Sequence, residues 1–124
     1  GVSAVIERDM DCTPLGLPLY VSPGDEEQMI VCQTKHDSLY VCGTGDSFSV
    51  PHINYQICEM EAYALAKVCH KFCVPFDCYK YISDSDADGE DQGNEWRENV
   101  HKGAELFTST VLDKEVTEEQ LELI

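Results

Sequence analysis

A helical pattern between two short β-like runs constrains the fold of this chain more than any other feature. Residues 59–72 carry apolar side chains at three- and four-residue spacing, which is typical of an amphipathic helix. Residues 55–58 before it and residues 76–82 after it are predicted as strands, and Val74-Pro75 ends the helix. The order strand, helix, strand predicts a parallel, right-handed crossover within one sheet.

Further short elements extend this unit. Residues 2–6, 29–32 and 39–42 are apolar runs rich in Val, Ile and Tyr, and they are predicted as strands. Residues 95–112 have helical periodicity, and residues 117–120 are predicted to cap a short last helix. We therefore predict an α/β layered fold in which helices flank a mixed or parallel sheet.

The length of 124 residues fits one domain, so residues 1–124 are predicted to form a single domain. A domain of this size buries only about two-thirds of the surface of its unfolded chain, and its core is correspondingly small. Association of two copies would bury more apolar surface, and we therefore expect a homodimer.

The net charge of −16 excludes two classes of partner. A strongly acidic chain repels phosphate backbones and anionic lipid, so we expect neither nucleic-acid binding nor membrane-surface binding. No run approaches the roughly 18 apolar residues of a membrane span, and the opening apolar run is too short for a signal peptide.

The seven cysteines are odd in number and irregularly spaced. Several stand in apolar runs, such as Cys32 after Val31 and Cys42 after Val41. This usage is typical of reduced, buried thiols rather than of a disulfide framework. Together with the absence of a targeting segment in this sequence, it predicts a cytoplasmic protein.

Three strand ends carry the residues suited to chemistry. One predicted strand leads into Thr44–Phe48, a second into Glu59–Glu61 and a third into Ser83-Asp84. In open parallel sheets the ligand lies at the carboxyl ends of the strands. A glycine turn, an aromatic ring and several carboxylates suit a neutral aromatic ligand with hydroxyl groups, such as a nucleoside.

At these positions the sequence resembles a known family. Glu59-Met60-Glu61-Ala62, Val68-Cys69-His70, Val74-Pro75-Phe76 and Ile82-Ser83-Asp84 look like the signature run of the methylthioadenosine/S-adenosylhomocysteine nucleosidases, of the purine nucleoside phosphorylase superfamily. The loops at residues 44–48 and 9–16 are similar to that family as well. The resemblance implies the C-terminal half of its fold and the release of adenine from thioether nucleosides by hydrolysis, without a cofactor.

The resemblance also implies roles in substrate binding. Phe48 would stack on the adenine, and the backbone of Ser49 would read the edge of the base. Met60 would pack against the ribose, and Glu61 would hold the ribose hydroxyl groups. Glu59 belongs to the same substrate-binding run.

The implied catalytic residues lie further along the chain. Asp84 would give a proton to N7 of the departing base, and Ser83 would orient Asp84. The acid must keep its proton near neutral pH, which burial and neighbouring negative charge favour. In this family a neighbouring subunit closes the outer end of the pocket, and the matching stretch here runs from Leu15 to Pro23.

Two departures from the family pattern keep other functions open. The family's N-terminal half carries a glutamate that activates water, and no such residue is found here. The loop Ser83–Gly89 is one residue longer than the family's Ser-Asp-x-Ala-Asp-Gly. The alternatives are a nucleoside-binding or regulatory half without its own catalysis and, ranked lower because basic residues are few, a purine nucleoside phosphorylase.

Two metal sites are conceivable, and neither is predicted. The acidic residues of 84–95 fit the spacing of an EF-hand loop, but the segment entering it is predicted as a strand where an EF-hand needs a helix. Cys69, His70, Cys73 and Cys78 have zinc-like spacing, but the run crosses a helix and a strand, so the side chains would point apart. We expect no metal and no cofactor.

Overall fold

The computed structural model describes most of the chain, namely residues 1–25, 27–32, 39–48, 53–85 and 92–112. The chain divides into two compact units, residues 1–80 and residues 81–124. Each unit is described here by itself. The single domain expected from the length stays a prediction.

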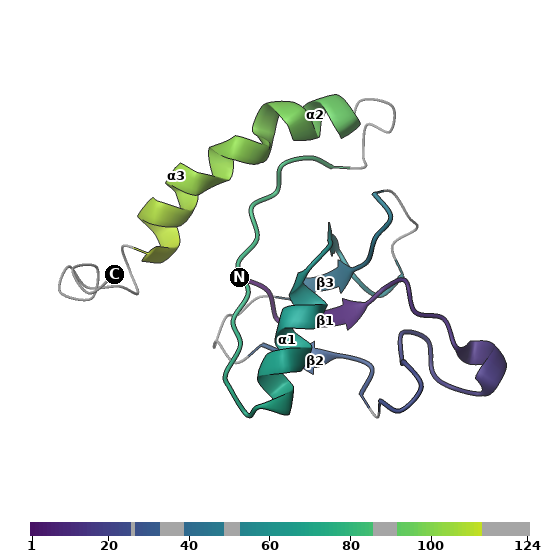
Figure 1. Ribbon diagram of the computed structural model, residues 1–124. Coiled ribbons are helices and arrows are strands. Elements are labelled where there is room, and N and C mark those ends of the chain that lie inside the picture. The colour runs from purple at the N-terminus through teal and green to yellow at the C-terminus, as the bar shows by residue number, and fades with distance from the viewer. Residues whose placement is uncertain (26, 33–38, 49–52, 86–91, 113–124) are drawn as a thin grey trace. The chain divides into compact units, whose positions relative to one another are not determined.

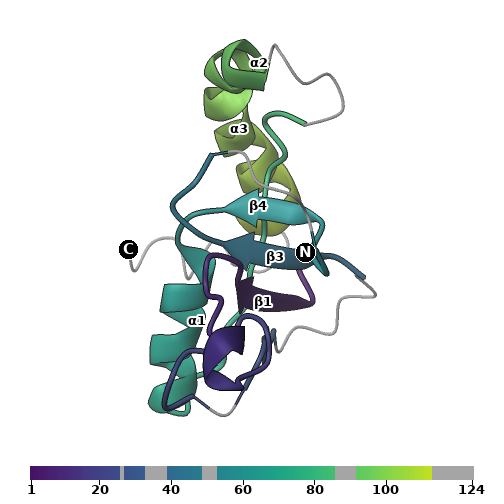
Figure 2. The same cartoon turned by 90° about the vertical axis from the view of Figure 1, so that its right-hand side faces the viewer.

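The first unit is built on a four-stranded sheet with the order β2-β1-β3-β4. Its strands are β1 (Ala4–Glu7), β2 (Ile30–Val31), β3 (Val41–Thr44) and β4 (Ile57–Glu59). Strand β1 pairs in parallel with β3, and β3 in parallel with β4 (Figure 2). Strand β2 pairs with β1 in the antiparallel direction. The predicted mixed sheet of an α/β fold is confirmed, and each strand lies within two residues of its predicted start.

The two faces of this sheet bury different clusters, as the alternation of side chains along β1 requires. Val5 faces one cluster and Ile6 the other. The first cluster lies between the sheet and helix α1 (Ala62–Lys71). The second cluster joins Ile6 to Tyr20 and Tyr55, whose rings meet edge to face at 6.4 Å. Gly43 in β3 is required there, because a Cβ atom would lie 2.7 Å from the Tyr55 ring.

Helix α1 covers one face of the sheet (Figure 1). Its buried residues are Ala62, Tyr63 and Ala66, and the two alanines let the helix approach the strands closely. The helix ends where Cys73 takes the left-handed conformation (φ 55°). The Cys73 N–H then donates to the His70 carbonyl at 3.1 Å, and the Val74 N–H donates to the Cys69 carbonyl at 2.8 Å. These two hydrogen bonds close the C-terminus of the helix, and Pro75 prevents the helix from continuing.

The strand predicted at residues 76–82 is wrong, and the predicted crossover fails with it. Residues 73–85 form neither helix nor strand. One backbone bond joins this segment to the start of the chain, from the Val2 N–H to the Cys78 carbonyl at 2.9 Å. Strand β1 already has β2 and β3 on its two sides, so the segment finds no free edge there. Phe76 and Cys78 instead pack against the cluster under α1.

The second unit is helical from residue 92 to residue 112. It consists of α2 (Gln92–Asn99), a 3₁₀ turn (Val100–Lys102), α3 (Gly103–Phe107) and a π-helical end (Thr108–Leu112). The helix predicted at 95–112 is therefore confirmed, with an earlier start. The last helix predicted around residues 117–120 lies outside the described residues. Within the described part of the chain, no helix is long and apolar enough to cross a membrane.

Candidate functional site at the carboxyl ends of three strands

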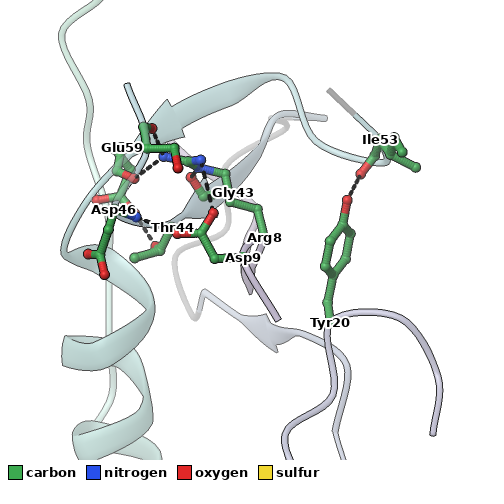
Figure 3. A network of polar contacts seen from close by, with 9 residues as sticks. Arg8, Asp9, Tyr20, Gly43, Thr44, Asp46, Ile53 and Glu59 are labelled. Atoms are coloured by element: carbon green, nitrogen blue, oxygen red, sulfur yellow. Dashed lines mark hydrogen bonds and ion pairs between the residues drawn. The ribbon is translucent and has the colours of Figure 1, made fainter. Parts of the chain in front are cut away.

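Three parallel strands end at the same edge of the sheet. Strand β1 leads into Arg8-Asp9, β3 into Gly45–Phe48, and β4 into Met60-Glu61. Register places Glu7 beside Thr44 and Thr44 beside Glu59, so the three exits are neighbours. This is the edge at which ligands bind in open α/β sheets. A network of polar contacts, shown in Figure 3, ties the exits together.

Arg8 lies at the centre of this network, with only 1% of its side chain exposed. Its Nε donates to the Gly43 carbonyl at 3.0 Å, and its Nη2 donates to the Ser47 carbonyl at 2.6 Å. The same Nη2 lies 3.5 Å from the Glu59 carbonyl. The guanidinium group therefore contacts the backbone of both other strand exits.

Asp9 holds the glycine turn from the other side. Its Oδ1 lies 3.3 Å from Arg8 Nη1, and its Oδ2 accepts a hydrogen bond from the Asp46 N–H. A Cβ atom on Gly45 would lie 2.4 Å from the Asp9 carboxyl carbon. Only glycine leaves room for this carboxylate, which explains the residue type at that position.

The Glu59 carboxylate is used within the protein. Its Oε2 accepts from the N–H groups of Glu61 at 2.9 Å and Ala62 at 2.8 Å, and its Oε1 accepts from the Thr44 hydroxyl. Thr44 Oγ1 in turn accepts from the Tyr63 N–H at 2.9 Å. Three N–H groups at the start of α1, which the helix itself leaves without partners, are thereby satisfied by side chains of two strands.

Lys80 adds a positive charge to this carboxylate. Its Nζ lies 3.0 Å from Glu59 Oε2, and the two side chains are 26% and 8% exposed. Burial alone would raise the pKa of Glu59, but hydrogen bonds from Thr44, from the N–H groups of Glu61 and Ala62 and from Lys80 outweigh it, and the pKa of Glu59 is lowered. Burial would lower the pKa of Lys80, but the bond to Glu59 prevails and raises it. Both directions favour the ion pair.

The lowered pKa of Glu59 makes part of the stability pH-dependent. A carboxyl group whose pKa is lower in the folded state stabilises the fold above its ordinary value of 4.5, and this contribution is lost as the pH falls through the folded value. Glu59→Gln is therefore expected to cost a constant amount of unfolding free energy between pH 6 and 8, about 1–3 kcal/mol. The difference from the unsubstituted chain should shrink below about pH 4.5.

Urea denaturation at a series of pH values measures this difference. The matched control is Glu27→Gln, since the pair that Glu27 forms with His70 at 3.4 Å is exposed and such pairs contribute little. A Glu59→Gln difference that stays constant down to pH 3 would contradict the role assigned to the Glu59 charge.

Three of the residues predicted to bind the substrate lie around this network with exposed side chains, whereas the predicted Glu59 side chain is 8% exposed and bonded within the network. Phe48 is 48% exposed, Met60 is 46% exposed, and Glu61 is exposed as well. The Glu61 side chain thus remains directed away from the core, while its N–H is held by Glu59. Ser49 lies outside the described residues.

The predicted catalytic pair belongs to the second unit. The Ser83 hydroxyl donates to Asp84 Oδ1 at 2.6 Å, and both residues are half-buried. Just beyond them, the Ser85 N–H donates to Glu95 Oε2 at 3.2 Å, so the acidic loop is anchored to the first turn of α2. The central residues of the considered EF-hand spacing, 86–91, lie outside the described part of the chain.

The two ends of the stretch expected to meet a neighbouring subunit are exposed, whereas Tyr20 and Val21 within it are buried. Leu15 ends a 3₁₀ turn (Thr13–Leu15) and is 71% exposed, and Pro23 is also exposed. Gly16 closes the turn with φ 81°, a conformation that favours glycine. Exposure leaves both side chains available to a partner.

All seven cysteines are free thiols. Cys32, Cys42 and Cys78 are buried together under α1, whereas Cys73 is exposed. Burial, with small contributions from Cys78 and Asp77, raises the pKa of Cys32 to about 11. Among the residues that the structure describes, no three His, Cys, Asp or Glu side chains are placed to hold a metal ion.

Three residues of the network were not singled out from the sequence: Arg8, Thr44 as a helix cap, and Lys80. A basic residue directly after an apolar strand, in a chain with only eight Lys and Arg, was the available signal for Arg8. No local pattern marks Thr44 or Lys80, because their partners lie 15 and 21 residues away.

Comparison with known protein families gives one match. The sequence model of the family described as "Phosphorylase superfamily" matches residues 37–113, which is more than half of the chain and includes β3, β4, α1, Ser83 and Asp84. No curated protein and no solved structure matches.

Proposed function

Because the chain belongs to the phosphorylase superfamily, we propose that it cleaves the N-glycosidic bond of adenine thionucleosides such as methylthioadenosine and S-adenosylhomocysteine by hydrolysis. The observation that carries this proposal is the exposed Phe48 and Glu61 at neighbouring strand exits, on a network that fixes their backbone. The aromatic ring offers a stacking surface for a base. The carboxylate offers two acceptors for a pair of ribose hydroxyl groups.

The reaction requires charge to be stabilised at two places. As the bond between the sugar and the base breaks, positive charge develops on the ribose and negative charge on the adenine. Glu61 beside the ribose stabilises the first, and Met60 packs against the sugar face. Stabilisation of charge that develops in the transition state is commonly the largest contribution to catalysis.

Asp84 is the proposed general acid. It transfers its proton to N7 of the base, so that adenine leaves neutral, while a water molecule adds to the sugar carbon and its proton returns to solvent. The hydrogen bond from Ser83 to Asp84 Oδ1 supports the role of Ser83 in orienting the acid. A positioned acid of this kind contributes about 10²–10⁴-fold to rate.

Glu59 is proposed to act on the substrate through its neighbours. Its carboxylate accepts from the N–H groups of Glu61 and Ala62 at the start of α1. It thereby fixes the position of the backbone that carries the Met60 and Glu61 side chains. We further propose a homodimer in which the loop between Leu15 and Pro23 closes the pocket of the other subunit, since both residues are exposed. Binding of the adenine edge by the Ser49 backbone belongs to the same proposal.

The direct test measures the release of adenine from methylthioadenosine by chromatography. The reaction is run once with and once without inorganic phosphate. Release that needs no phosphate is the expected result and means hydrolysis. Release that requires phosphate would replace the hydrolase by a phosphorylase. Saturable binding of methylthioadenosine without release would mean a nucleoside-binding half, and the absence of both binding and release would contradict the site assignment.

A further inference from the structure

Arg8 is a buried cation in contact with backbone carbonyls of two other strand exits. Its fork of N–H groups reaches the Gly43 and Ser47 carbonyls, with the Glu59 carbonyl 3.5 Å away. Burying a charge is unfavourable unless every donor finds a good partner. Among the described residues, Arg8 contacts backbone carbonyls and its own neighbour Asp9, which suits it to fixing loops rather than to binding ions from solvent.

The loops that it fixes lead into the proposed binding residues. Ser47 directly precedes Phe48, and Glu59 stands two residues before Glu61. Asp9 holds the same glycine turn through the Asp46 N–H and by filling the space beside Gly45. The Arg8-Asp9 pair is therefore the point at which the base side and the ribose side of the site are joined.

We infer that Arg8 and Asp9 form a clamp that sets the affinity for the nucleoside by holding the Phe48 loop at a fixed position relative to Glu61. The inference rests on the proposed function, because it concerns the ligand of the same site. Arg8 and Asp9 are positioning residues, and neither needs to touch the substrate. Figure 3 shows the Arg8 and Asp9 side chains beside Gly43, Asp46 and Glu59.

The planar fork of arginine is essential to this role. It can donate hydrogen bonds to carbonyls on two loops at the same time, whereas the ammonium group of lysine is a single point of contact on a flexible stem. Arg8→Lys therefore keeps the charge and most of the buried stem but breaks the link between the two loops. We therefore expect Arg8→Lys to weaken ligand binding by the folded chain itself. The loss of affinity should exceed the loss that partial unfolding of the variant would cause.

The first experiment compares Arg8→Lys with the unsubstituted chain and with Arg97→Lys, an exposed arginine of α2 that contacts Asn94. Titration with methylthioadenosine gives the dissociation constant, and amide hydrogen exchange of the ligand-free chain reports on the Gly45 and Asp46 N–H groups. We expect Arg8→Lys to bind at least about tenfold more weakly. We also expect its Gly45 and Asp46 amides to exchange faster, with sheet amides such as Cys42 unchanged and Arg97→Lys without effect.

The two readouts separate the clamp from the function. Affinity equal to that of the unsubstituted chain would overturn the inference, and so would unchanged exchange at Gly45 and Asp46. If the unsubstituted chain binds no nucleoside, the proposed function fails. Exchange alone then decides whether the clamp exists, and the affinity role falls with the function.

Gly45 gives a second test that does not involve Arg8. Gly45→Ala places a methyl group against the Asp9 carboxylate and should weaken ligand binding severalfold. In an Asp9→Ala background the space is free, so the same Gly45→Ala change should have little further effect. Equal effects of Gly45→Ala in both backgrounds would show that Asp9 does not pack against the turn and would overturn the clamp.

Discussion

Asp84→Asn is expected to lower the rate of adenine release by about 10²–10⁴-fold while leaving methylthioadenosine binding nearly intact. Asparagine has the same shape as aspartate and can still accept from Ser83, but it has no proton to transfer to the base. The loss should therefore appear in kcat rather than in KM. Initial rates over a range of substrate concentrations measure both constants.

The matched control is Asp77→Asn, an exposed acid seven residues upstream on the same connecting segment. It should leave kcat within about twofold of the unsubstituted chain, because exposed substitutions away from a site have small effects. A nucleoside whose base leaves readily without protonation should also be cleaved almost equally by Asp84→Asn and the unsubstituted chain. A large loss with such a substrate would mean that Asp84 has another role than that of the acid.

Glu61→Ala is expected to reduce kcat/KM by at least about a hundredfold. Hydrogen bonds to a charged acceptor contribute about 1.5–3 kcal/mol each, and the proposal gives Glu61 two of them from the ribose. The fold should be kept, because the Glu61 side chain is exposed and its N–H bond to Glu59 uses only the backbone. Steady-state rates and thermal melting, measured together, separate these two effects.

Substrate analogues sharpen the test of Glu61. A nucleoside that lacks the ribose hydroxyl groups has nothing for this carboxylate to accept, so the unsubstituted chain and Glu61→Ala should process or bind it almost equally. Glu27→Ala, which removes an exposed carboxylate of the same unit, serves as the control. Equal penalties from Glu61→Ala on full and deoxygenated substrates would place Glu61 away from the ribose.

The sequence predicted the parts of the fold that depend on local patterns. Short apolar runs marked β1 to β4, and three- and four-residue spacing marked α1 and the helical segment from residue 92. The failure at residues 76–82 has a different origin. Aromatic and apolar side chains there do pack against the core, but strand formation also needs a free neighbouring edge, and edges follow from the order of the sheet rather than from local sequence.

The candidate site was predictable in part for the same reason. The strand ends that carry Phe48 and Glu61 follow from element boundaries, so the sequence could place them at one edge of the sheet. The support beneath them is non-local, since Arg8 reaches residues 35 and 39 positions away. The sequence placed Glu59 only in a substrate-binding run, whereas the structure shows its carboxylate bonded to two particular N–H groups.

The arrangement of the thiols bears on how the purified protein behaves. With a pKa of about 11, Cys32 stays protonated in the folded chain, and it lies out of reach of reagents with Cys42 and Cys78. Cys73, by contrast, can be alkylated without any opening of the fold. Thiol labelling can therefore measure unfolding. The label on Cys73 gives the total amount of protein, and the label on the three buried cysteines gives the fraction of molecules that have unfolded. In air such opening also invites mismatched cross-links, so the shelf life of the pure protein depends on the reductant in its buffer.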